Sequence, residues 1–166
     1  DSAESFAGGP VTAFIEDCYW PTLGENHIAY PPLKTTIRRS VFAHAWREGA
    51  GNQGYYSSGS TNEVLVDEVI FYRNGFKSDP LTDPDPLREV VGRNIYEGGG
   101  AKMGHVFRNV IGADGGSGGP QMRFGGLMEE SLIIEGYWYA STDSGEPDNP
   151  WLVAEGQTGQ SAWIRN

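Results

Sequence analysis

The chain has 166 residues, a formal net charge of −10 and one cysteine, Cys18. The length suits one domain with a buried core. The charge excludes nucleic acid and disfavours anionic membranes as partners, because both require Lys and Arg patches. One cysteine excludes an internal disulfide, and no apolar run reaches the roughly 18 residues of a membrane-spanning helix. The chain opens at Asp1, which fits a mature secreted chain or a trimmed one, and we expect a secreted or extracellular location.

Short apolar runs between Gly- and Pro-rich turns predict an all-β fold. The chain holds 24 glycines and 10 prolines, and 12% of its residues are aromatic. In chain order, we expect strands at residues 11–20, 35–46, 63–72, from 90 onward, and at 103–111, 122–130, 131–141 and 151–163. This pattern favours a sandwich or a barrel over a helical fold, and we recognise no internal repeat.

Two acids, Asp67 and Glu68, interrupt the apolar strand at residues 63–72. Neighbouring residues of a strand point to opposite faces. We therefore expect one acid to face the interior and the other to face solvent. A solvated position on the outer face is the alternative for Glu68.

The segments around this strand carry a family resemblance. After the strand come Ser78-Asp79-Pro80-Leu81-Thr82 and Val91-Gly92-Arg93, and near the C-terminus come Ala154-Glu155-Gly156-Gln157-Thr158-Gly159 and Arg165. Over residues 61–166 these motifs resemble the dirigent and allene-oxide-cyclase barrel superfamily. The resemblance implies a single antiparallel β-barrel formed by residues 61–166. Residues 1–60 would form an N-terminal arm that packs on the barrel or completes it.

The resemblance also implies a function. Such barrels carry out a cofactor-independent, stereoselective cyclisation or coupling of a hydrophobic small molecule inside the barrel, where a buried acid donates a proton or orients water. The implied catalytic residues are Glu68, or Asp67 if the register slips by one, together with Arg93 and Arg108. The implied substrate-binding residues are Tyr72, Tyr96, Tyr137, Tyr139 and Arg165. Surface salt bridges are the alternative for the two catalytic arginines, and plain core packing is the alternative for each tyrosine.

Metal and cofactor chemistry is not expected. The histidines at 27, 44 and 105 lack the spacing of metal ligands. Asp79, Asp83 and Asp85 invite a calcium hypothesis, but a solvated, proline-stiffened turn is the alternative that we prefer.

The family's last barrel strand has no counterpart in this chain. An open barrel exposes an unpaired edge, so we expect residues 11–20 or 35–46 to cover it, from the same molecule or from a neighbour. A homo-oligomer is the expected assembly, and strand exchange is one route to it. The competing functional class is a non-catalytic extracellular protein. It is either a subunit that assembles by β-strand donation or a glycan-binding module that stacks sugars on Trp20, Tyr55, Tyr56 and Trp151.

Overall fold

The structure is a computed structural model. It describes residues 12–29, 31, 34–48, 51–57, 63–86, 92–97, 104–116, 120–123, 126–134, 153–155 and 162–165, with the backbone alone for residue 123 and for the last two segments. Every regular element in these ranges is a β-strand. No helix in the described ranges is long and apolar enough to cross a membrane.

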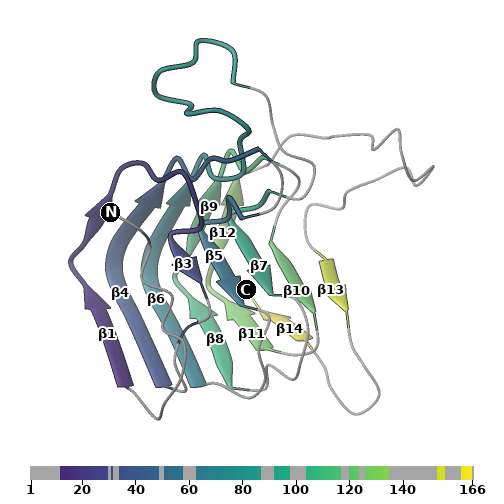
Figure 1. The fold of residues 1–166 in the computed structure, drawn as a ribbon. Helices are drawn as coiled ribbons and strands as arrows, with labels where there is room; N and C mark the ends of the chain where they lie inside the picture. Colours follow the sequence, from purple (N-terminus) through teal and green to yellow (C-terminus); the bar gives the residue numbers. More distant parts are fainter. Residues whose placement is uncertain are drawn as a thin grey trace.

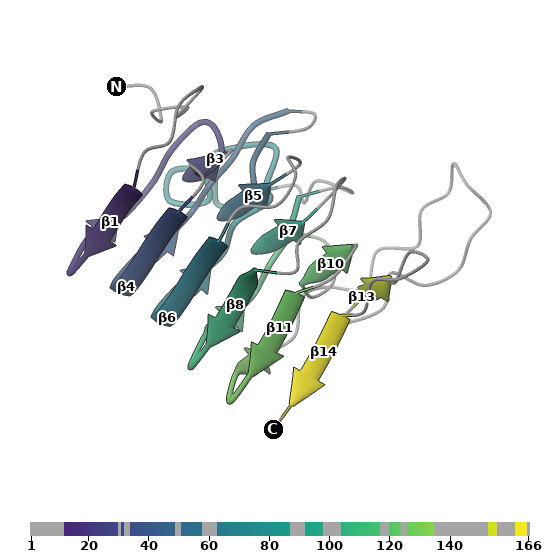
Figure 2. The same cartoon turned by 90° about the horizontal axis from the view of Figure 1, so that it is seen from below.

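The strands form two sheets in which every pairing is parallel. The strands are β1 (Thr12–Glu16), β2 (Tyr19–Trp20), β3 (Ile28–Ala29), β4 (Lys34–Ala43), β5 (Tyr55–Ser57), β6 (Glu63–Tyr72), β7 (Ile95–Glu97), β8 (His105–Arg108), β9 (Ile111–Ala113), β10 (Gln121–Arg123), β11 (Gly126–Glu129), β12 (Leu132–Ile134), β13 (Val153–Glu155) and β14 (Ala162–Arg165). One sheet has nine strands and includes the path β1-β4-β6-β8-β11-β14, and the other has five in the order β13-β10-β7-β5-β3. The two rows of parallel arrows face each other in Figure 2.

The chain winds into a parallel β-solenoid. It leaves the large sheet after β4, contributes β5 to the small sheet, and returns as β6 beside β4; β7 and β8 repeat this path (Figure 1). Parallel neighbours cannot be joined by a hairpin, so each coil must cross to the other sheet and back. Each coil has three walls, which we number in chain order. The small sheet is wall three, and the large sheet is bent into walls one and two.

A bend between walls one and two recurs in five coils. The bend residues are Asp17, Arg39, Glu68, Asn109 and Glu130, and each has a positive φ between 46° and 56°. We call this set the corner column, because the flanking residues are in register from coil to coil. A left-handed residue breaks the alternation of a strand and turns the chain. The bend therefore lets one continuous strand such as β6 serve two walls.

A second bend follows wall two and is stabilised by a buried asparagine. His44, Arg73 and Asp114 have φ values of 60°, 52° and 49°. Beside them the Asn74 side chain donates to the carbonyl of Phe42 at 3.0 Å and accepts the N–H of Ala45 at 2.9 Å. These bonds satisfy backbone groups that the bend removes from the sheet ladder.

The core fills the inside of the coils. Wall one contributes the column Ile37, Val66, Phe107 and Met128, wall two contributes Phe42 and Phe71, and wall three contributes Ile28, Tyr55 and Ile95. Phe42 and Phe71 stack with centroids 5.6 Å apart. Stacked coils thus bury one continuous apolar core, as in other repeat architectures.

Three sequence-based expectations about the fold are wrong. The described strands form no closed barrel, and their pairings are parallel rather than antiparallel. Runs of β-branched and aromatic residues locate strands but do not specify the direction of their partners. A repeat also exists: the coils recur along the chain without a fixed period.

Residues on both sides of position 60 belong to the same two sheets. β4 pairs with β6 along most of its length, and β5 pairs with β7. The N-terminal segment does add a strand, because β1 lies parallel to β4 within the same chain. It extends an open sheet and does not close a barrel.

Candidate functional site

Charged residues alternate in sign along one register column of wall one. Register pairs each residue of this column with the next, in the order Glu16, Arg38, Asp67, Arg108, Glu129 and Arg165. We call this column the charge ladder. Neighbouring strands are about 4.8 Å apart, so like charges would repel at this spacing and opposite charges attract. The alternation therefore favours the observed order of coils.

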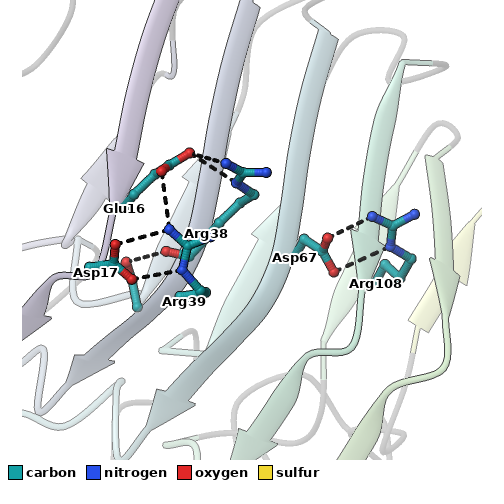
Figure 3. A network of polar contacts seen from close by, with 7 residues as sticks. Glu16, Asp17, Arg38, Arg39, Asp67 and Arg108 are labelled. Carbon is teal, nitrogen blue, oxygen red and sulfur yellow. Dashed lines mark hydrogen bonds and ion pairs between the residues drawn. The ribbon is translucent and has the colours of Figure 1, made fainter.

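Two groups of ion pairs dominate the ladder (Figure 3). Arg108 donates to both carboxylate oxygens of Asp67, with Nη2–Oδ2 at 2.6 Å and Nε–Oδ1 at 3.2 Å. Arg38 donates to Glu16 Oε1 from Nη2 at 2.6 Å and from Nε at 2.9 Å. In the corner column, Arg39 donates to both oxygens of Asp17 at 2.7 and 2.9 Å. Paired donors of this kind are the strongest side-chain hydrogen bonds in water-exposed sites.

These contacts lower the pKa of two carboxyl groups. The hydrogen bonds from Arg108 hold the pKa of Asp67 below its usual value, with Asn109 and the charge of Arg38 adding to the effect and partial burial opposing it. The Arg39 hydrogen bonds lower the pKa of Asp17 in the same way. Both carboxylates therefore remain ionised and act as acceptors across the neutral pH range.

Neither predicted acid faces the interior. Val66 and Val69 are buried, Asp67 lies on the outer face of wall one, and Glu68 is exposed at the corner. The alternation that predicted one inward acid fails because Glu68 has a φ of 56°. Arg108 pairs with the Asp67 carboxylate on the outer surface, which is the surface salt bridge given above as the alternative to its catalytic role.

The remaining predicted residues are dispersed. Arg165 shares the charge ladder by register. Tyr72 is 40% exposed on wall two. Tyr96 is half-buried on wall three and stacks on Tyr56 with centroids 5.6 Å apart. Arg93 is buried just before β7. Tyr137 and Tyr139 lie outside the described residues.

A polar cluster that sequence reasoning missed lies inside the coils. The fully buried Glu97 and His105 are joined by a hydrogen bond between Oε1 and Nδ1. The Tyr55 hydroxyl lies 3.4 Å from the same nitrogen, and burial together with the charge of Glu97 raises the pKa of Tyr55 well above its usual value. Full burial keeps these groups from external ligands, so we assign them a structural role.

Wall two carries a continuous apolar surface on its outer side. Its central column, which we call the apolar stripe, is Tyr19, Val41, Ile70, Ile111 and Leu132. Tyr19 is 64% exposed, Ile70 38% and Leu132 54%. Tyr72 and Ile134 extend the surface toward the second bend, at 40% and 53% exposure. Contiguous exposed apolar patches on a protein surface often mark interaction sites.

Two other sequence hypotheses concern aromatic platforms and metals. Trp20 packs against the core, Tyr55 is fully buried, and Trp151 lies outside the described residues. In the described part of the chain, no group of three or more His, Cys, Asp or Glu side chains is placed to hold a metal ion. Asp79 and Asp83 accept backbone N–H groups of Leu81 and Asp85, as capped turns do.

The fold defines the class of this protein as a parallel β-solenoid with a charged wall and an apolar wall. Scans of protein-family models, curated proteins and solved structures found no match. The dirigent resemblance therefore rests on the quoted motifs alone.

The stripe and the ladder do have a sequence signal. One six-residue pattern recurs in the sequence, at IEDCYW, IRRSVF, VDEVIF, FRNVIG and MEESLI. Its first residue is apolar, its second is charged, its third is charged or Asn, its fourth is Cys, Ser or Val, and its fifth is apolar. These hexads begin at residues 15, 37, 66, 107 and 128. The third position is the corner and the fifth is the apolar stripe.

Proposed function

We propose that this chain is a non-catalytic binding module that contacts another protein through the apolar outer face of wall two. The observation that carries the proposal is the apolar stripe, in which the exposed Tyr19, Ile70 and Leu132 alternate with the half-buried Val41 and Ile111 along the parallel sheet. Solenoids characteristically present such extended surfaces for binding.

Two features favour this class over the cyclase. The stereoselective reaction requires an enclosed apolar cup, and the described strands form no closed barrel. Asp67 and Arg108, both assigned to catalysis by the resemblance, are paired with each other on the outer surface. A carboxyl group with a lowered pKa is already deprotonated at neutral pH, so Asp67 has no proton to donate to a substrate.

A protein partner is also favoured over a glycan. Sugar recognition needs aromatic rings that lie open to solvent, and of the predicted platforms Trp20 and Tyr55 pack into the core. Most of the stripe is aliphatic, namely Val41, Ile70, Ile111 and Leu132. Aliphatic surfaces bind other apolar protein surfaces and offer few hydrogen bonds to sugar hydroxyls.

The test compares two kinds of ligand with one surface variant. Binding to a panel of amphipathic helical peptides and to a panel of insoluble polysaccharides is measured for the wild type and for Ile70→Ser/Leu132→Ser. We expect peptide binding that the variant loses, and no polysaccharide binding. Phe14→Ser/Leu81→Ser is the matched control, because these side chains are exposed elsewhere, at 68% and 55%. Polysaccharide binding that the stripe variant abolishes would support the glycan alternative instead.

A further inference from the structure

We infer that the partner segment that covers the apolar stripe is cationic along one flank. This inference rests on the proposed function and adds the charge and orientation of the ligand. It follows from the acids that border the stripe at the first corner and from the distribution of ion pairs around them.

The first corner has more acids than cations. Among the described side chains, the charge ladder and the corner column hold six acids and three arginines; the acids are Glu16, Asp17, Asp67, Glu68, Glu129 and Glu130. The three arginines are engaged with Glu16, Asp17 and Asp67. In the described ranges, no ion pair involves Glu68, Glu129 or Glu130.

Two of these glutamates directly border the stripe. Glu68 is two residues before Ile70, and Glu130 is two residues before Leu132, at equivalent places in their coils. Both are exposed. A Lys or Arg beside the apolar contact of a partner would meet them at the rim of the interface, where complementary charges select partners and speed association.

The border of the stripe at the second bend differs in its charge. Past Tyr72, Arg73 forms an ion pair with Asp114 at 3.3 Å. The excess of negative charge therefore lies along one side of the stripe, and a partner with cations on one flank would bind in one orientation.

A second copy of the chain is a poor occupant. It would bring another net charge of −10 and the same acidic border to the interface, and like charges at short range oppose association. A cationic segment supplies the missing charge.

The stripe also fits a particular ligand length. Five stacked strands span about 19 Å at about 4.8 Å per step. A helix covers that length with about 13 residues, presenting apolar side chains at a spacing of three and four residues.

The experiment uses three synthetic helical peptides of about 14 residues with one shared Leu stripe and with Lys, Gln or Glu along one flank. Their affinities for the wild-type chain are measured by fluorescence anisotropy at low and high salt. We expect the Lys peptide to bind most tightly and the Glu peptide most weakly, with a difference that salt reduces. The variant Glu68→Gln/Glu130→Gln should bind the Lys peptide roughly threefold to tenfold more weakly than the wild type does. Its affinity for the Gln peptide should be unchanged. Glu48→Gln/Glu63→Gln, which removes the same charge elsewhere, should change neither.

Two results separate this inference from the proposed function. Equal affinity of all three peptides, lost in Ile70→Ser/Leu132→Ser, would retain the apolar binding surface and overturn the cationic partner. Absence of binding by every peptide, or binding that the stripe variant leaves intact, would overturn both. Sedimentation showing a dimer that the stripe variant dissociates would overturn the inference in favour of a second copy.

Discussion

Arg108 on β8 and Asp67 on β6 form a two-pronged ion pair across adjacent coils, with Nη2–Oδ2 at 2.6 Å and Nε–Oδ1 at 3.2 Å. The Asp67 side chain is 14% exposed and the Arg108 side chain is 41% exposed. The pair is therefore more shielded from solvent than the Lys34–Glu63 pair on the same wall, at 65% and 72%.

We expect this pair to contribute measurably to the free energy of unfolding. A double-mutant cycle with Asp67→Asn and Arg108→Gln should give a coupling energy of about 0.5–1 kcal/mol by urea denaturation. The same cycle at Lys34 and Glu63 should give less than about 0.3 kcal/mol, because exposed pairs are screened. Purely additive effects at Asp67 and Arg108 would show that the ladder aligns charges without stabilising the coils.

The corner column makes a prediction about backbone conformation. Glu68 has a φ of 56°, a region that Asn tolerates and β-branched residues do not. Glu68→Val should cost roughly 1–2 kcal/mol in thermal unfolding, whereas Glu68→Asn should be near neutral. Glu63→Val, the same exchange at an extended position of the same strand, is the control for adding a β-branched residue. Equal stability of the Val and Asn variants would contradict the role given to the corner.

Close backbone contact makes another position intolerant of a side chain. A Cβ on Gly116 would clash with the backbone carbonyl of Gly75. Gly116→Ala should therefore lower the free energy of unfolding by roughly 3 kcal/mol or more, because two backbone segments must separate. Gly24→Ala is the control: its nearest neighbour is a ring atom of Trp46 at 3.7 Å, and a change within about 0.5 kcal/mol is expected. A well-folded Gly116→Ala protein with wild-type stability would refute this packing.

A buried histidine predicts the pH dependence of stability. Burial lowers the pKa of His27 from 6.5 to about 4, while its bond to the Ala43 carbonyl, at 2.7 Å, opposes the shift and the neighbouring His44 adds to it. The folded state thus binds a proton less readily than the unfolded state. Stability is full above pH 6.5 and falls as the pH decreases toward 4, by on the order of 3 kcal/mol.

Urea titrations across this range test the assignment. His27→Gln retains a donor for the Ala43 carbonyl but no longer titrates. Its stability should fall less steeply than that of the wild type between pH 6.5 and 4. Matching slopes in the two proteins would assign the acid sensitivity to other groups.

The buried Glu97–His105 pair predicts a non-additive result. His105→Leu leaves Glu97 in the core without its partner, and such a loss typically costs about 3–5 kcal/mol. The double variant Glu97→Leu/His105→Leu replaces both groups with apolar ones and should be more stable than His105→Leu alone. Chemical denaturation of the three proteins measures this. A double variant that is no more stable than His105→Leu would contradict the expectation.

Sequence reasoning located strands better than it arranged them. The strand at residues 63–72 coincides with β6. The run at 11–20 contains β1 and β2 on either side of a corner, and the run at 103–111 contains β8, a corner and the first residue of β9. Strand composition reflects burial on one face, which is a local property. The direction of strand pairing depends on residues that are distant in the sequence. The bends at Asp17 and Asn109 are hard to recognise from the local sequence, because several residue types occupy the corner column.

The candidate site was harder to predict for the same reason. Asp67, Glu68 and Arg108 were selected for an interior role, and their actual relationship is visible only when positions 16, 38, 67, 108 and 129 are aligned. Their spacing varies from 21 to 41 residues, since the segments between walls differ in length. A search for a fixed period misses such a repeat, whereas a search for the hexad finds it.

Because the signs of the charge ladder alternate, the effect of removing coils depends on whether their number is odd or even. Excising the single coil that carries Asp67 would place Arg38 beside Arg108, and so two positive charges would meet. Excising the coils of Asp67 and Arg108 together would place Arg38 beside Glu129 and restore opposite signs. Removing or adding two coils at a time therefore keeps opposite charges next to each other, whereas removing or adding one coil does not. The same rule constrains how such a chain can grow by duplication.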